Sequence, residues 1–306
     1  MQTKVPVIYS DSYYVDIGDH VFPTSKYRII KERILKDPDI SCRIQMLAPR
    51  EISGEDVLRA HTAGYIHKLK SGKLSEEEII TMEVPYSPAL VESSFICCAG
   101  TLTAVMEAVE RGCAFHLGGG FHHAFSDHGE GFCVLNDIAV GIRAIQAERP
   151  AVKVLVVDCD VHQGNGTAAI FRKDDLVFTL SIHQENNYPY FKQQSDMDIG
   201  LEDGTGDEAY LEKLRGALPG IMDSFRPGLI VYVAGADPYA RDQLGGLALS
   251  RKGLRERDNY VLRAAKDRSV PIAVTLAGGY AFNRQDTVEI HLNTLKECVR
   301  VFGCEL

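Results

Sequence analysis

The sequence lacks the features that mark membrane spans, exported chains and nucleic-acid-binding proteins. Its longest apolar runs fall far short of the ~18 residues that a bilayer-spanning helix needs. The opening Met-Gln-Thr-Lys-Val-Pro contains no apolar signal-peptide core. Lysine and arginine number 33 against 42 aspartates and glutamates, and this net charge of −9 argues against a basic nucleic-acid-binding surface. We therefore expect a cytoplasmic chain with no membrane span and no direct nucleic-acid partner.

Paired cysteine motifs and domain linkers are also lacking. The eight cysteines are scattered, no two have CxxC spacing, and Cys133 and Cys159 lie in apolar or motif-rich stretches. This pattern predicts free thiols in a reducing compartment rather than disulfides. No repeat or Pro/Gly/Ser-rich linker divides the 306 residues. We expect a single domain over residues 1–306, with no regulatory tail beyond its last helix.

Short apolar runs alternate with longer amphipathic stretches along the chain. The apolar runs predict strands buried on both faces of a parallel sheet, at residues 5–9, 114–117, 154–157, 177–182, 229–233 and 272–276. The amphipathic stretches predict helices at residues 56–70, 94–111, 137–148, 208–225, 254–267 and 287–302. Ser53 and Asp207 are expected to begin helices and Gly112 to end one. This alternation predicts an open α/β fold with right-handed crossovers.

Polar clusters follow four of the predicted strands at the point where each strand ends. They are Gly-Gly-Gly-Phe-His-His at 118–123, Asp-Cys-Asp-Val-His at 158–162, Gly-Ala-Asp at 235–237 and Gly-Gly-Tyr at 278–280. Ligands of open α/β sheets bind beyond the carboxyl ends of the strands. We therefore expect all four clusters to lie on the same rim.

The residue types in these clusters suit a metal-dependent hydrolase. Asp160 and His162 lie two apart after a strand, so an extended backbone points both side chains the same way, and Asp237 reaches the same rim. Two carboxylates and an imidazole leave room for water or substrate on a metal ion. An isolated Asp-x-His is more often a capped strand end, and the neighbouring clusters favour the metal site. His122 and His123 suit general acid/base roles, and a phenol such as Tyr280 can stabilise an oxyanion.

Six motifs in order resemble the histone deacetylase branch of the arginase/deacetylase superfamily, closest to its class IV type and bacterial relatives. They are HLGGGFHHAF (116–125), GEGFCVLND (129–137), VVDCDVHQGNGT (156–167), LSIH (180–183), AGADPYARDQLGG (234–246) and LAGGYAFN (276–283). The resemblance covers essentially the whole chain. It implies a single-domain α/β fold with a mainly parallel eight-stranded sheet, two strands more than the pattern locates.

The same resemblance implies a role for each site residue. Asp160, His162 and Asp237 would hold the metal, with zinc expected first and ferrous iron as an alternative. His122 and His123 would form the acid/base pair, and Tyr280 would polarise the scissile amide carbonyl.

The two histidines are expected to have different partners. Asp158 matches the carboxylate behind His122, whereas Asn165 stands behind His123 where many relatives have aspartate. Because asparagine supplies no charge, we expect His123 to stay neutral and act as base, while Asp158 keeps His122 cationic.

Structural potassium sites and a substrate channel are further implications of the resemblance. One cation site would use Asp158, Asp160, His162, Ser181 and Ile182, and a second would use backbone oxygens near Phe171, Asp174 and Val177. One channel wall would comprise Gly131 and Phe132, and the other Tyr188 or Tyr190, which sequence does not separate. Residues 19–26 are a candidate lip, with Phe22 and Pro23 equally well read as core anchors. No residue matches the rim aspartate of some deacetylases, and 76–78 are only nearby candidates.

The expected activity is hydrolysis of an N6-acyl-lysine amide in proteins or peptides. Deacylation of a small acylated amine, such as an acetylpolyamine, is the alternative on the same machinery. A non-enzymatic acyl-lysine-binding module ranks lower, because the ligands, both histidines and Tyr280 are all present. We interpret His20, His61, His67, His128, His183 and His291 as surface or satisfied core residues, and His116 as structural. Acyl chain length and oligomeric state stay open.

Overall fold

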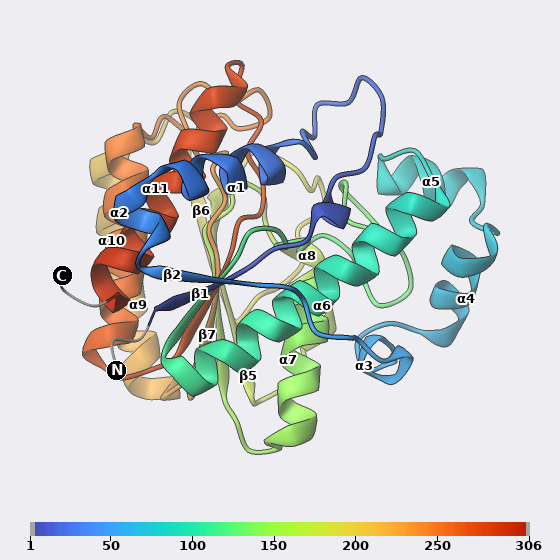
Figure 1. Cartoon of the computed structure of the whole chain (residues 1–306), viewed down its shortest axis with the longest axis horizontal. Helices are drawn as coiled ribbons and strands as arrows, with labels where there is room; N and C mark the ends of the chain where they lie inside the picture. The colour runs from blue at the N-terminus through green and yellow to red at the C-terminus, as the bar shows by residue number, and fades with distance from the viewer. Residues whose placement is uncertain (1–3, 304–306) are drawn as a thin grey trace.

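A computed structural model describes residues 4–303 and shows a parallel sheet with helices on both faces (Figure 1). The eight strands lie in the order β2-β1-β3-β8-β7-β4-β5-β6, and every neighbouring pair is parallel. Their bounds are β1 Val5–Ile8, β2 Ile44–Leu47, β3 Cys113–His116, β4 Val154–Asp158, β5 Val177–Gln184, β6 Met197–Leu201, β7 Leu229–Val233 and β8 Ile272–Thr275. The α/β fold and the eight-stranded sheet are thus confirmed.

The sequence pattern located the six inner strands and missed the two edge strands. Inner strands such as β4 and β7 are buried at every position, which produces the continuous apolar runs. The edge strands β2 and β6 have one covered and one open side, and their residues are mostly half-buried or exposed. Sequences such as Met-Asp-Ile-Gly-Leu therefore carry no continuous apolar signal.

Eleven α-helices connect or flank the strands within the described residues. Their bounds are α1 Lys26–Lys36, α2 Pro38–Ser41, α3 Gly54–Leu58, α4 Ala63–Ser71, α5 Glu76–Met82, α6 Pro88–Arg111, α7 Asp137–Glu148, α8 Asn165–Phe171, α9 Asp207–Phe225, α10 Arg251–Asp267 and α11 Arg284–Phe302. A short 3-10 helix, η1 Asp11–Tyr13, follows β1.

The helix predictions hold at five of six places. The expected helix 56–70 is wrong: α3 ends at Leu58, and Thr62 starts α4 by accepting a hydrogen bond from Tyr65 N. Ser53 caps α3 through a reciprocal box with Asp56, and Gly112 ends α6 in a left-handed conformation, as predicted. Asp207 is the first residue of α9, so this helix begins where it was expected.

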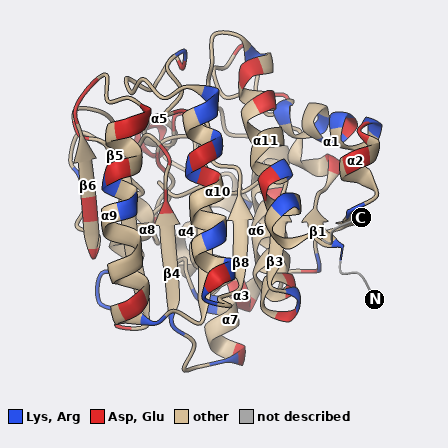
Figure 2. Ribbon diagram, turned by 90° about the vertical axis from the view of Figure 1, so that its left-hand side faces the viewer, with Lys and Arg blue, Asp and Glu red and all other residues tan. Residues whose placement is uncertain are grey.

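The sheet separates two hydrophobic layers. Helices α9, α10 and α11 lie side by side over one face and carry most of their charged residues outward (Figure 2). Helices α6 and α7 pack together on the other face. Each layer has its own cluster of buried apolar side chains.

By length and apolar composition alone, helix α6 could cross a bilayer. The expectation that no stretch reaches this limit is therefore corrected for α6. However, 67% of its most apolar window is buried inside the protein, so the feature is weak evidence for a membrane segment. Core helices pass the same test.

The four strands that carry polar clusters are the four adjacent central strands, β3, β8, β7 and β4. Because all are parallel, their carboxyl ends share one edge, and the clusters at 118–123, 278–280, 235–237 and 158–162 come together there. This arrangement builds the site described next.

Candidate active site

Asp160, His162 and Asp237 form a compact group at the carboxyl ends of β4 and β7. One potential ligand atom from each lies within 4.8 Å of the others, and all three side chains are buried. His162 Nδ1 lies 3.1 Å from Asp160 Oδ1 and 3.5 Å from Asp237 Oδ2. The predicted ligand set is therefore brought together.

The surroundings of this group fit a divalent cation. Asp237 Oδ2 is buried and has no hydrogen-bond partner among the described residues. Burying a carboxylate oxygen in this way costs folding free energy unless a cation faces it. The other three carboxylate oxygens accept backbone hydrogen bonds: Asp160 Oδ2 from Gly278 N at 2.8 Å, Asp160 Oδ1 from His162 N at 3.1 Å and Asp237 Oδ1 from Val161 N at 2.9 Å. A Cβ on Gly278 would lie 1.9 Å from Asp237 Oδ2, so only glycine leaves this space open. Two carboxylates and one imidazole suit Zn²⁺ or Fe²⁺.

His122 and His123 form a buried pair beside the metal group. Their Nε2 atoms lie 3.1 Å apart, and each Nδ1 faces the partner expected from sequence. His122 Nδ1 lies 2.6 Å from Asp158 Oδ2, and His123 Nδ1 lies 2.7 Å from Asn165 Oδ1. One histidine therefore has an anionic partner and the other a neutral one.

This difference in partners separates the pKa values of the two imidazoles. Burial lowers the pKa of His122, but Asp158 and Asp160 outweigh burial and raise it to about 9. Burial and the neighbouring imidazoles of His122 and His162 hold the pKa of His123 well below its ordinary value. At neutral pH the pair thus offers one cationic and one neutral imidazole, which suits an acid and a base.

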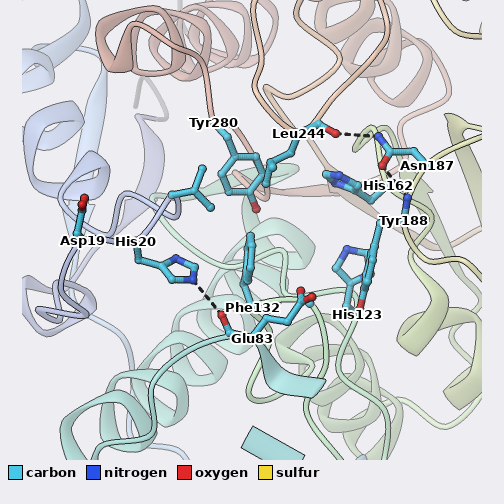
Figure 3. Close-up of a pocket in the computed structure, with 12 residues that line it drawn as sticks. Asp19, His20, Glu83, His123, Phe132, His162, Asn187, Tyr188, Leu244 and Tyr280 are labelled. Carbon is cyan, nitrogen blue, oxygen red and sulfur yellow. Dashed lines mark hydrogen bonds between the residues drawn. The ribbon is translucent and has the colours of Figure 1, made fainter. Parts of the chain in front are cut away.

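Tyr280 lines a cavity of about 490 Å³ that extends from the candidate metal ligand His162 to the surface. Its hydroxyl points into the cavity, toward the space between Phe132 and His162 (Figure 3). The Tyr280 ring packs 5.8 Å from the Phe132 ring and 6.4 Å from the His162 ring. The loop that carries Tyr280 is held in place by a hydrogen bond, because Tyr280 N donates to Asp242 Oδ2 at 2.6 Å.

Phe132 and Tyr188 face each other across the cavity as its walls, and Tyr190 does not take part. Tyr188 lies edge-on to His123 at 4.9 Å between ring centroids, whereas Tyr190 is 89% exposed and does not line the cavity. The candidacy of Tyr190 is therefore wrong. Gly131 has φ +51°, and a Cβ there would lie 2.8 Å from His123 Cδ2, so this position needs glycine.

Residues 19–26 form a lip only in part. Asp19, His20 and Val21 line the cavity, whereas Phe22 is a buried core anchor stacked on Phe132. Lys26 is also buried, and its Nζ donates to the carbonyl of Ala277 at 2.6 Å.

Sequence reasoning assigned no role to the cavity residues Glu83 and Leu244, and it interpreted the side chain of His20, within the candidate lip, as an ordinary one. Glu83 ends α5 with φ +57° and lines the cavity, whereas residues 76–78 do not. His20, which was expected to be an ordinary surface or core residue, contacts the carbonyl of Glu83 through Nε2 at 2.9 Å and packs 4.9 Å from Phe132 (Figure 3). A pairing between residues 63 positions apart leaves no local pattern in the sequence.

The residues of the expected potassium sites lie at the ends of β4 and β5 and in the turn after α8. Asp158 pairs with Ser181 in the sheet, next to Ile182, while Asp160 and His162 follow β4. The carbonyls of Phe171 and Asp174 accept hydrogen bonds from Asp174 N and Val177 N. The residues of each predicted cation site therefore lie close to one another.

A buried arginine supports the loops that carry the candidate metal ligands. Arg257 on α10 donates through Nη1 to the carbonyls of Cys159 at 3.1 Å and Gly235 at 2.8 Å. Its charge is balanced by Asp258, 2.8 Å away. Within a charged helix such as α10, sequence alone gives no sign that this arginine points inward.

Comparisons with known proteins agree with this site. The histone deacetylase domain family matches residues 20–295. An uncharacterised protein of the cyanobacterium Picosynechococcus is 37% identical over 94% of this chain and 95% of its own length. Histone deacetylase 2 of Arabidopsis thaliana is 31% identical over 91% and 75%, and the histone deacetylase-like amidohydrolase of Pseudomonas aeruginosa is 30% identical over 85% and 72%. The chain therefore belongs to the histone deacetylase family.

Proposed function

We propose that this protein is a metal-dependent amidohydrolase that removes acyl groups from the ε-amine of lysine in proteins or peptides. The observation that carries the proposal is the meeting of three potential ligands, an asymmetric histidine pair and a phenol at the base of one cavity. Family membership supports deacetylation as the reaction type.

The metal would be held by Asp160, His162 and Asp237. When bound, a divalent ion supplies Lewis acidity toward the amide carbonyl and toward water. Zinc is our first choice and ferrous iron the second, because this donor set accepts both.

The chain's own residues would divide the remaining work. Neutral His123 takes a proton from the attacking water at Nε2, since its Nδ1 is held by Asn165. Cationic His122 then gives a proton from Nε2 to the leaving amine, with Asp158 stabilising its charge. Tyr280 donates a hydrogen bond to the carbonyl oxygen as that oxygen becomes negative.

The shape of the cavity supports a long, flexible amine as substrate. Aromatic walls at Phe132 and Tyr188 suit the methylene chain of lysine, and the open end lets a peptide stay outside. A small acylated amine, such as an acetylpolyamine, fits the same walls and is the second candidate. Asp19 and Glu83 at the cavity favour it, because carboxylates attract a second ammonium group. Cytoplasmic location and structural potassium ions belong to the same proposal.

The test is kcat/KM on one lysine peptide that carries acetyl, butyryl, octanoyl or myristoyl groups, together with an acetylated diamine. Rates that rise with chain length would indicate a deep apolar pocket, and highest activity on acetyl a short one. Preference for the diamine would favour the small-amine alternative. No hydrolysis of any substrate by zinc- or iron-loaded protein would contradict the proposal.

Tyr280→Phe provides the mechanistic control. Removing the hydroxyl should lower kcat by about 10²–10³, the usual cost of losing one oxyanion donor. Tyr190→Phe makes the same chemical change on an exposed ring outside the cavity and should leave kcat unchanged. Full activity in Tyr280→Phe would reopen the binding-module interpretation.

A further inference from the structure

Glu130 lies between Asn165, the partner of His123, and Tyr188 in the cavity wall, and sequence reasoning assigned it no role. Its Oε1 atom accepts two hydrogen bonds, from Asn165 Nδ2 at 2.7 Å and from the Tyr188 hydroxyl at 2.9 Å. Burial raises the pKa of Glu130, but hydrogen bonds from His128, Tyr188 and Asn165 outweigh burial and hold the pKa below its ordinary value. Glu130 is therefore an anionic acceptor shared by two parts of the site.

This shared acceptor fixes the orientation of the Asn165 amide. A carboxylate can only accept hydrogen bonds, so the amide must turn its NH₂ group toward Glu130 and its oxygen toward His123. Asn165 is 1% exposed, and Oδ1 lies 2.7 Å from His123 Nδ1. That nitrogen must then carry the proton, which leaves His123 Nε2 as the basic atom facing His122.

The second hydrogen bond fixes the channel wall. Tyr188 packs edge-on against His123 at 4.9 Å and lines the cavity, and its backbone is held through Asn187. The hydroxyl at the far end of its ring has one described partner, Glu130 Oε1. Glu130 Oε1 thus links the tautomer of His123 to the position of Tyr188 in the cavity wall.

We propose that Glu130 is a positioning residue that sets the tautomer of His123 through Asn165 and holds Tyr188 in the channel wall. The role of His123 as base rests on the proposed function, but the tautomer itself does not. A plain alternative is that Glu130 only pairs with His128, whose Nε2 lies 3.5 Å from Oε2 and whose side chain is 34% exposed.

The experiment compares Glu130→Ala, Glu130→Gln, Tyr188→Phe and His128→Gln, each checked for fold and for bound metal. Glu130→Ala should lower kcat at least tenfold, because the Asn165 amide is free to rotate. Glu130→Gln keeps an oxygen that can accept both hydrogen bonds and should recover most of the loss. Tyr188→Phe should change KM more than kcat, and His128→Gln should change neither.

A spectroscopic readout separates this proposal from the proposed function. Imidazole ¹⁵N NMR of metal-free, histidine-labelled protein reports the tautomer, with His123 identified by its absence in His123→Ala. The Nδ1–H form should dominate in wild type and Glu130→Gln and should decline in Glu130→Ala, whatever substrate the enzyme takes. If Glu130→Ala does not fold, Glu130→Met fills a similar volume without a strong acceptor and is measured instead. Unchanged tautomer and kcat in the folded variant would overturn the proposal, as would equal losses in His128→Gln.

Discussion

At the scale of single residues, the site depends on which histidine has a charged neighbour. Burial lowers the pKa of His122, but Asp158 and Asp160 together raise it to about 9, whereas Asn165 offers His123 an oxygen without a charge. Both partners were predictable, because they lie within one motif after β4. Glu83 and Glu130 were not, because their contacts join segments far apart in the chain.

An Asn165→Asp variant tests the division of roles. A carboxylate next to His123 would stabilise its protonated form, so the imidazole would lose its basic form at a higher pH. The acidic limb of kcat/KM should move to higher pH by about 1–3 pH units. A pH–rate profile checks this in a Glu130→Gln background, because the Glu130 carboxylate would otherwise lie against the new carboxylate at position 165. Asn186→Asp adds the same charge on the exposed loop as control. An acidic limb in the position that Glu130→Gln alone shows would refute the assignment of His123 as base.

At the scale of secondary-structure elements, burial decided what could be predicted. Strands buried on both faces carry continuous apolar runs, whereas the edge strands β2 and β6 do not. The edge strands were missed, whereas at 56–70 the pattern predicted too much: one continuous helix where the structure has two, α3 and α4. A helical period continues through the turn, and only the Thr62 cap marks the start of α4.

Helix α10 makes a testable contribution through Arg257. Replacing it with methionine removes two hydrogen bonds to the loops that carry the candidate metal ligands and leaves Asp258 buried without its ion-pair partner. The free energy of unfolding should fall by about 3–5 kcal/mol, measured by urea denaturation. Lys252→Met on the same helix breaks an exposed pair with Glu256 and should change stability little. Equal effects of the two substitutions would contradict the supporting role of Arg257.

At the scale of the whole molecule, strand order accounts for the site. The chain visits β3, β4, β7 and β8 at distant points in the sequence, and the sheet makes them neighbours. The rule that ligands bind at carboxyl ends of strands predicted this rim in advance. The depth and lining of the cavity could not be predicted, because loops from several separate segments meet there. Their packing, rather than any motif, sets the shape of the cavity.

The most direct test of the account is metal removal and reconstitution, followed by metal analysis and hydrolysis of an N6-acetyl-lysine peptide. We predict one divalent ion per chain, loss of ion and activity together on chelation, and return of both with Zn²⁺ or Fe²⁺. Asp237→Asn should retain the fold but bind the ion weakly and hydrolyse little, because the unpartnered Oδ2 atom is replaced or turned away. Full hydrolysis by the metal-free chain would contradict the central claim.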